Sequence, residues 1–364
     1  MKRAQYYRRV EMHRNSPFNP NGGLTIVAMT GFEDIAYQVA AGVQKKGRKR
    51  GNFRTPVDVV IPTLVYYGSG EPKVRLGKKH IGGHDVIILT SGPGTPKMLV
   101  ELTSLLGYVA RRRARRIIVI TAYFPMARSD KDDERELAMP PIWVDAWQGA
   151  SKGKLDRMVC VDPHSDHVTS AGGGGFVTPI KMTRRLLMEL VEQALQQSEH
   201  VVLSFPDNTS RKRFKAALKD LKNKLGRKLP IVYASADRDE DGKLIDEVAG
   251  QVDAIPGSLV VQLDDETASG GTQIDVARML KAMGASSVWG GVTHGVLCDN
   301  AVERFSAPDC PIDRLYINDT IIPSNRPELV PLIESGRLRV LSWLNDLIWV
   351  VYKLHWDEDV RELR

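Results

Sequence analysis

The sequence predicts an α/β protein with two tandem domains, each containing a mostly parallel sheet flanked by helices. Short runs rich in Val, Ile and Leu alternate with helix-length segments along the chain. Such runs are typical of strands in parallel sheets, because helices cover both faces of these sheets. The length of 364 residues exceeds the size at which a single hydrophobic core usually stops growing, so two domains are expected.

The strands and helices can be placed in chain order from these patterns. The apolar runs expected to be strands are 24–29, 85–90, 116–121, 157–162, 200–205, 230–235, 258–263, 286–294 and 314–319. Apolar residues at spacings of three and four predict helices over 32–46, 97–112, 183–197, 210–225 and 273–283.

The alternation of strands and helices divides near residue 180, after the glycine run at 172–175 and Pro179. Each half contains its own set of strands and helices, which indicates two similar domains. The expected parts are an N-terminal extension at 1–23, a first domain at 24–180, a second domain at 181–336 and a C-terminal tail at 337–364. The tail is rich in apolar residues and is expected to pack on a domain.

The composition is that of a water-soluble globular protein, with 42% hydrophobic and 26% charged residues. No stretch has the roughly 18 consecutive apolar residues that predict a membrane span, so no membrane partner is expected. The cysteines, Cys160, Cys298 and Cys310, are widely spaced and form no CxxC pair. They support neither a disulfide framework nor a cysteine zinc site, and we expect a cytoplasmic protein.

Basic residues exceed acidic ones, with 51 Lys and Arg against 44 Asp and Glu. Part of this excess lies in two clusters, at 45–50 and 111–116. Neither cluster has the interleaved aromatic residues that are typical of single-stranded nucleic-acid binding. We therefore expect solvated charge that also attracts anionic metabolites, and not a nucleic-acid partner.

The strongest chemical pattern is SLVVQLDDETASGGTQIDVARML, at 258–280, where a strand leads through a short loop into a helix. The strand ends in Asp264 and Asp265, whose carboxylates can accept hydrogen bonds from vicinal sugar hydroxyls or hold a magnesium-bound ligand. The small residues of the loop are Ser269, Gly270, Gly271 and Thr272. Their backbone N–H groups can approach a phosphate at the helix N-terminus. A phosphorylated pentose could bind both the carboxylates and the N–H groups. The alternative is an ordinary acidic strand end before a capped helix.

LDDETASGGT, at 263–272, resembles the phosphoribosyl-diphosphate motif of type I phosphoribosyltransferases and of ribose-phosphate diphosphokinases. Other segments resemble the diphosphokinases alone, in order and spacing: YFPMARSDKDDE (123–134), VDPHSDH (161–167), FPDNTSRKR (205–213), THGVLCDNAVERF (293–305) and INDTIIP (317–323). Simple phosphoribosyltransferases do not contain the segments found in the first half of this chain. The sequence is therefore identified as a divergent member of the ribose-phosphate diphosphokinase family.

This resemblance implies two tandem type I phosphoribosyltransferase-like domains and an ATP-dependent reaction. The β,γ-diphosphoryl group of ATP passes to the C1 hydroxyl of ribose 5-phosphate, which gives phosphoribosyl pyrophosphate and AMP. The resemblance also implies Mg²⁺ and a homo-oligomer whose subunits share ATP sites. The sequence has no GxxxxGK[ST] motif, so the ordinary P-loop is excluded as the ATP site.

The resemblance also assigns roles residue by residue. The positions implied to bind ATP are Arg128 and Lys131, with Tyr67, Ser69 and Glu71 reaching the adenine of a neighbouring subunit. Those implied to hold a divalent cation are Asp162 and His164. Those implied to bind the sugar and its phosphate are Asp264, Asp265, Ser269, Gly270, Gly271 and Thr272. Arg238 is implied to assist the transfer.

Three departures from the family pattern bear on activity and substrate. Ser235 occupies the position of a lysine on the family's mobile loop, which leaves Arg238 as the nearby cation. Ala268 replaces a usual aspartate, and 167–179 lacks the usual carboxylates. Two alternatives therefore stay open: the same chemistry on a larger acceptor such as ADP-ribose, and a catalytically weak regulatory homologue that binds nucleotide.

Overall fold

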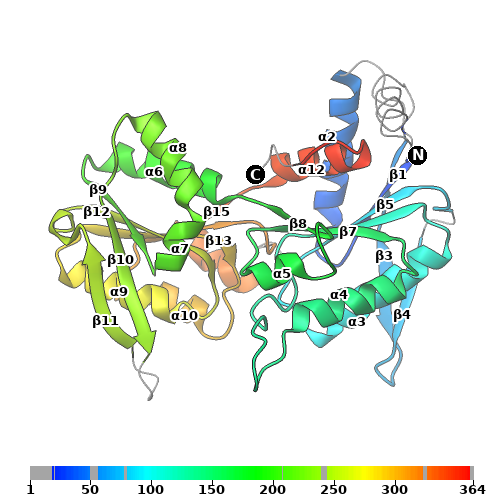
Figure 1. Ribbon diagram of the computed structural model, residues 1–364, viewed down its shortest axis with the longest axis horizontal. Coiled ribbons are helices and arrows are strands. Elements are labelled where there is room, and N and C mark those ends of the chain that lie inside the picture. The colour runs from blue at the N-terminus through cyan, green and yellow to red at the C-terminus, as the bar shows by residue number, and fades with distance from the viewer. Residues whose placement is uncertain are drawn as a thin grey trace. The chain divides into compact units, whose positions relative to one another are not determined.

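A computed structural model describes residues 19, 21–49, 56–77, 80–206, 208–238, 244–322 and 326–360. Within these ranges the side chains at 48–49, 208–209, 235–238 and 244–247 are not described. The chain forms two compact units: unit 1 contains Met1–Ile180 and Trp343–Arg364, and unit 2 contains Lys181–Ser342 (Figure 1). In the part of the chain that the structure describes, no helix has the length and apolar character needed to cross a bilayer.

Unit 1 is built on a six-stranded sheet of order β2-β1-β5-β6-β7-β8, in which all pairs are parallel. Its strands are β1 Leu24–Ala28, β2 Val57–Val60, β5 Asp85–Thr90, β6 Arg116–Thr121, β7 Leu155–Val161 and β8 Val177–Ile180. A separate antiparallel hairpin consists of β3 Pro62–Tyr66 and β4 Pro72–Leu76. The helices are α2 Glu33–Lys49, α3 Pro96–Arg111, α4 Met139–Ala150, α5 Asp166–Ser170 and α12 Leu344–His355.

The last helix, α12, belongs to unit 1 and packs against α2. Gly42 makes this approach possible, because a Cβ atom there would lie 2.5 Å from Cδ1 of Ile348. Lys46 of α2 lies over the ring of Trp349, with Nζ 3.3 Å from the ring centroid. The expected tail at 337–364 is thus divided, since Leu338–Leu341 forms strand β15 in unit 2 and α12 packs in unit 1.

A buried ion cluster joins this C-terminal segment to the sheet of unit 1. Asp85, at the start of β5, is fully buried and accepts two hydrogen bonds from Arg116, of 2.9 and 2.8 Å. His355 Nδ1 lies 2.8 Å from the same carboxylate, and Arg116 also bonds the Asp357 carboxylate at 2.5 Å. Burial alone would raise the pKa of Asp85, but hydrogen bonds from His355 and Arg116 lower it below its ordinary value.

Unit 2 is built on a seven-stranded sheet of order β11-β10-β9-β12-β13-β14-β15, parallel except for the antiparallel β10–β11 pair. Its strands are β9 Val201–Phe205, β10 Ile231–Arg238, β11 Leu244–Gly250, β12 Leu259–Thr267, β13 Ser287–Gly295, β14 Arg314–Asn318 and β15. The α-helices are α6 Thr183–Gln197, α7 Asn208–Arg213, α8 Lys215–Leu225, α9 Gly271–Ala282, α10 Ala301–Ser306 and α11 Val330–Glu334.

Both faces of this sheet are covered, as the apolar strands require. Figure 1 shows α6 and α8 on one face and α9 and α10 on the other. One core cluster joins Ile274 and Leu280 of α9 to Phe305 of α10. The second cluster joins Leu190 of α6 to Leu221 of α8. The carboxyl ends of the central strands lie between the two helical layers, and ligands of open α/β sheets bind at such strand ends.

The predicted fold class is confirmed. The strands predicted at 85–90 and 116–121 and the helix at 183–197 have the bounds of β5, β6 and α6. The single helix predicted over 210–225 is wrong, because the chain forms α7 and then α8 on either side of Phe214. The fully buried Phe214 ring packs against Phe205 of the sheet, with ring centroids 5.4 Å apart.

Candidate functional site

Asp264 and Asp265 lie near the carboxyl end of β12, in the centre of the unit 2 sheet. β12 pairs in parallel with β9 on one side and β13 on the other. Asp265 is 5% exposed, whereas Asp264 is partly exposed.

The short helix α7 supplies a contact to each of these carboxylates. Ser210 Oγ donates a 3.1 Å hydrogen bond to Asp264 Oδ1, and Arg213 forms an ion pair with the Asp265 carboxylate. The backbone N–H of Asp265 also donates to Asp264 Oδ1, at 2.9 Å. Ser210 and Arg213 were not among the predicted site residues, although both belong to the FPDNTSRKR segment that resembles the family.

The two carboxylates differ in their electrostatic environment. Burial, together with the neighbouring Asp265 carboxylate, raises the pKa of Asp264 well above its ordinary value. The hydrogen bonds from the Asp265 N–H and from Ser210 oppose this shift without cancelling it. A carboxyl held in this state can form hydrogen bonds with sugar hydroxyls as donor or acceptor.

The loop after β12 places backbone N–H groups at the N-terminus of α9. Gly270 caps the helix with φ 75°, a left-handed conformation that glycine adopts at little cost. A Cβ atom there would also lie 2.6 Å from the Phe305 ring. The first N–H groups of a helix have no partner within it, so those of Gly271 and Thr272 can bind an anion, and the helix dipole favours this.

Contacts from the segment after β13 hold this loop in place. The N–H groups of Leu297 and Cys298 donate to the carbonyls of Thr267 and Ala268, both at 3.1 Å. Arg304 Nη1 donates to the Ser269 carbonyl at 3.2 Å, which brings a guanidinium to the edge of the helix N-terminus. Sequence reasoning missed Arg304, whose only signal was its place in the THGVLCDNAVERF block.

The predicted ATP-site segment of unit 1 follows β6. Its first part is anchored, since Tyr123 is buried and its N–H donates a hydrogen bond to Ser91 Oγ at 2.8 Å. Arg128 and Lys131 are exposed beyond it. The N–H groups of Arg135 and Glu136 donate to Asp133 and lower the pKa of that carboxyl, so the turn carries negative as well as positive charge.

Tyr67, Ser69 and Glu71 lie together in the turn of the β3–β4 hairpin. The N–H of Tyr67 donates to the Glu71 carbonyl at 3.0 Å, and Ser69 Oγ donates to the Glu71 carboxylate at 2.6 Å. Tyr67 is 54% exposed, and Nζ of Lys73 lies 5.2 Å from its ring centroid. The hairpin thus presents an aromatic ring and a carboxylate to solvent.

Asp162 and His164 follow the end of β7. Asp162 is 7% exposed and has φ 34°, so its backbone is held in an uncommon conformation at the strand end. In the described ranges, no group of three or more His, Cys, Asp and Glu side chains is arranged to hold a metal ion. Magnesium usually keeps several waters and takes one or two carboxylates plus substrate phosphates, so the Asp162 carboxylate fits that ion as a single protein ligand.

Arg238 ends strand β10, where its backbone pairs with Leu244 of β11. The side chains of Arg238 and Ser235 lie outside the described set, as do residues 239–243. The departure from the family pattern therefore falls in a β-hairpin next to the central strands. The antiparallel strand β11 was not predicted, because its sequence LIDEVAG carries two acidic residues in seven.

Comparison with known proteins decides the family. Residues 25–142 match the N-terminal domain of ribose phosphate pyrophosphokinase. A ribose-phosphate pyrophosphokinase of Hyphomonas neptunium is 30% identical over 266 residues, which cover 72% of this chain and 78% of the relative. That of Corynebacterium efficiens is 31% identical over 274 residues, 73% of this chain and 78% of the relative. The chain belongs to the ribose-phosphate pyrophosphokinase family.

Members of this family are transferases, and the chain is an enzyme of that class by descent. The fold agrees with this assignment. Phosphoribosylpyrophosphate synthetase from Mycobacterium smegmatis superposes with a TM-score of 0.71 at 24% identity, over 92% of this chain and 99% of the other. The two phosphoribosyltransferase-like units and their mostly parallel sheets are thus the architecture of a ribose-phosphate pyrophosphokinase.

Proposed function

We propose that this protein transfers the β,γ-diphosphoryl group of ATP to the C1 hydroxyl of ribose 5-phosphate. The products are phosphoribosyl pyrophosphate and AMP. One observation carries the proposal: Asp264 and Asp265 are adjacent near the end of the central strand β12, and the N-terminus of α9 at Gly271 follows that strand. Vicinal hydroxyls and a phosphate of one pentose require these two kinds of group at neighbouring positions.

The sugar is held in two ways in this proposal. Asp264 and Asp265 form hydrogen bonds with the 2- and 3-hydroxyls, and α7 orients both carboxylates through Ser210 and Arg213. The 5-phosphate accepts hydrogen bonds from the N–H groups after Ser269, where the α9 dipole favours an anion. Bonds at both ends leave C1 with one defined position, which supplies the orientation that the transfer requires.

The transfer itself needs positioning and charge neutralisation more than covalent catalysis. The C1 oxygen attacks the β-phosphorus of ATP, the bond from the β-phosphorus to the α,β-bridging oxygen breaks, and AMP leaves. Arg238 is proposed to stabilise the charge on the transferring group, since Ser235 cannot supply the cation usual at that position. The C1 hydroxyl proton is lost to solvent or to a phosphate oxygen.

ATP is proposed to bind through unit 1. Arg128 and Lys131 suit its phosphates by charge, while Tyr67, Ser69 and Glu71 are proposed to contact the adenine of a neighbouring subunit. This assignment requires a homo-oligomer. Asp162 and His164 would hold Mg²⁺, which supplies charge neutralisation at the phosphates when bound.

The proposal is tested by offering the purified protein ATP, MgCl₂ and ribose 5-phosphate and measuring products by mass spectrometry. We expect AMP and an acceptor heavier by one diphosphoryl group, in equal amounts. Labelling the β-phosphate of ATP identifies the group transferred, because the label must appear in the sugar product. AMP without a labelled sugar, or the label in free diphosphate alone, would refute the transfer.

A further inference from the structure

A second pocket in unit 2 lies away from the carboxylates, under helix α8. It has a volume of about 570 Å³, within the range of about 300–1,000 Å³ that is typical of small-molecule sites. Its floor is apolar, formed by Leu203 of β9, Leu218 of α8 and Ile231 of β10. Six of its lining residues are basic and none is acidic: Arg211, Lys215, Lys219, Lys222, Arg227 and Lys228.

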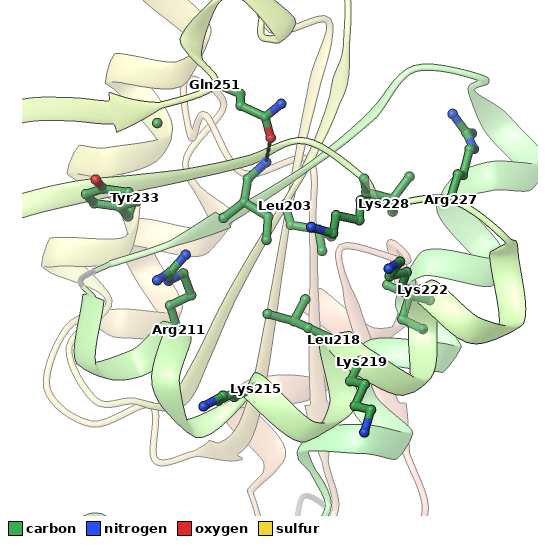
Figure 2. Close-up of a pocket in the computed structure, with 14 residues that line it drawn as sticks. Leu203, Arg211, Lys215, Leu218, Lys219, Lys222, Arg227, Lys228, Tyr233 and Gln251 are labelled. Carbon is green, nitrogen blue, oxygen red and sulfur yellow. Dashed lines mark hydrogen bonds between the residues drawn. The ribbon is translucent and has the colours of Figure 1, made fainter.

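These cations surround the apolar floor from several elements. Figure 2 shows Arg211 of α7 on one side and Lys228 on the other, with Leu203 and Leu218 between them. Lys215 and Lys219 extend from α8 along a third side. An anion in the pocket would therefore meet positive charge from α7, α8 and the segment before β10.

The distribution of charge on α8 differs between its two faces. Lys215, Leu218, Lys219 and Lys222 recur at spacings of three and four, which places them on one helix face. The other face is paired with α6, where Asp220 bonds Arg184 and Lys224 bonds Glu192. Among the described residues, Lys215, Lys219 and Lys222 form no ion pair. Like charges at this spacing repel one another, and a bound anion would remove that repulsion.

The pocket also has a wall that suits a planar group. Tyr233 of β10 lines one wall. Gln251 Oε1 accepts a 3.2 Å hydrogen bond from the Ile231 N–H.

We propose that this pocket binds a nucleoside polyphosphate. The base lies on the apolar floor beside Tyr233, and the phosphates lie among the lysines of α8 and Lys228. Aromatic and aliphatic side chains suit a base, and several cations are needed to neutralise a polyphosphate. The shared helix α7 gives the occupant a physical connection to the candidate active site, since Arg211 lines the pocket and Arg213 pairs with Asp265.

The test is acetylation of lysines in the full-length protein, followed by peptide mass spectrometry. The probes are ATP, GTP, adenosine, inorganic tripolyphosphate and a single-stranded oligoribonucleotide. At about ten times the dissociation constant, a nucleotide should slow acetylation of Lys215, Lys219, Lys222 and Lys228 by about tenfold. Lys224 lies on the opposite face and should be unaffected. This readout locates binding at the pocket, whatever happens at the ATP site proposed in unit 1.

A double variant and its control test the role of the pocket charges. Lys219→Gln with Lys222→Gln should raise the nucleotide concentration that protects Lys228 by at least about tenfold. Arg184→Gln with Lys224→Gln removes the same charge outside the pocket and should leave that concentration unchanged.

Four results would overturn the proposal. No protection by either nucleotide at millimolar concentration means that the pocket binds none. Equal protection by tripolyphosphate means that the base plays no part. Protection by a single-stranded oligoribonucleotide at lower concentration than by ATP assigns the surface to nucleic acid. Equal loss of protection in the two double variants means that net charge, and not the pocket, determines binding.

Discussion

Two aspartates, one in each unit, have opposite electrostatic environments. Asp85 at the start of β5 contacts Arg116 and His355, whereas Asp264 near the end of β12 lies beside Asp265. Burial raises the pKa of either carboxyl, but at Asp85 the hydrogen bonds reverse that effect. At Asp264 the like charge adds to it.

We interpret this difference as one between a carboxylate that stabilises the fold and one proposed to bind a ligand. Asp85 has its charge neutralised within the fold and joins the C-terminal segment to the sheet. Among the described residues, Arg213 pairs with Asp265, and the uncharged Ser210 donates to Asp264. A group that the fold leaves in an unfavourable state, at the carboxyl end of a central strand, is typical of a functional site.

Replacing Asp85 should have the largest effect on stability. Asp85→Asn leaves Arg116 and His355 buried without their carboxylate, and removal of one partner of a buried ion pair costs about 3–5 kcal/mol. The free energy of unfolding, measured with urea at pH 7, should fall by this amount. Asp220→Asn removes an exposed ion pair with Arg184 and should cost less than about 1 kcal/mol. Equal losses in the two variants would show that the buried cluster contributes no more to the free energy of unfolding than an exposed ion pair does.

Replacing Asp265 should remove activity and retain the fold. Asp265→Asn weakens a sugar contact and the ion pair with Arg213, and loss of one such electrostatic contact reduces kcat by about 10²–10³-fold. The rate of AMP formation checks this, with circular dichroism as the measure of folding. Asp275→Asn on the exposed side of α9 breaks only a surface pair with Arg278 and should leave the rate unchanged. Undiminished turnover in Asp265→Asn would refute the sugar-site assignment.

Replacing Asp264 should stabilise the protein while it removes activity. Because the folded pKa of Asp264 is raised, the group favours folding most at low pH and loses that contribution as pH rises through the folded pKa. The neutral amide of Asp264→Asn avoids this loss. Its thermal midpoint at pH 7.5 should therefore exceed that of the wild type, the reverse of the change in Asp85→Asn. A lower midpoint would contradict the proposed environment of Asp264.

The smallest expected effect is on how steeply the stability of the protein falls as the pH becomes acidic. The folded pKa of Asp85 is lowered, so its stabilisation is complete above the unfolded pKa of about 3.9 and is lost as pH falls through the folded value. Urea midpoints measured between pH 5 and pH 2.5 should thus fall less steeply in Asp85→Asn than in the wild type. Parallel profiles would place the acid sensitivity elsewhere.

The sequence predicted the parts of the fold whose signal is local. The runs of β5 and β6 and the helical spacing of α6 each fall within one segment, so their bounds were predicted to the residue. The contacts that define the two aspartates are not local. Ser210 is 54 residues from Asp264, and His355 is 270 residues from Asp85. A resemblance to the family named Asp264 but not Asp85. Only the folded chain brings α7 to Asp264 and α12 to Asp85.

The most direct test of the central claim is product analysis with ATP, MgCl₂ and two acceptors, ribose 5-phosphate and ADP-ribose, in separate reactions. A ribose-phosphate pyrophosphokinase should form AMP and a diphosphorylated sugar with ribose 5-phosphate, at a rate that Asp265→Asn reduces by about 10²–10³-fold. A product with ADP-ribose alone would contradict the proposed acceptor. Nucleotide binding without AMP formation from either acceptor would contradict the proposed transfer and favour a regulatory role.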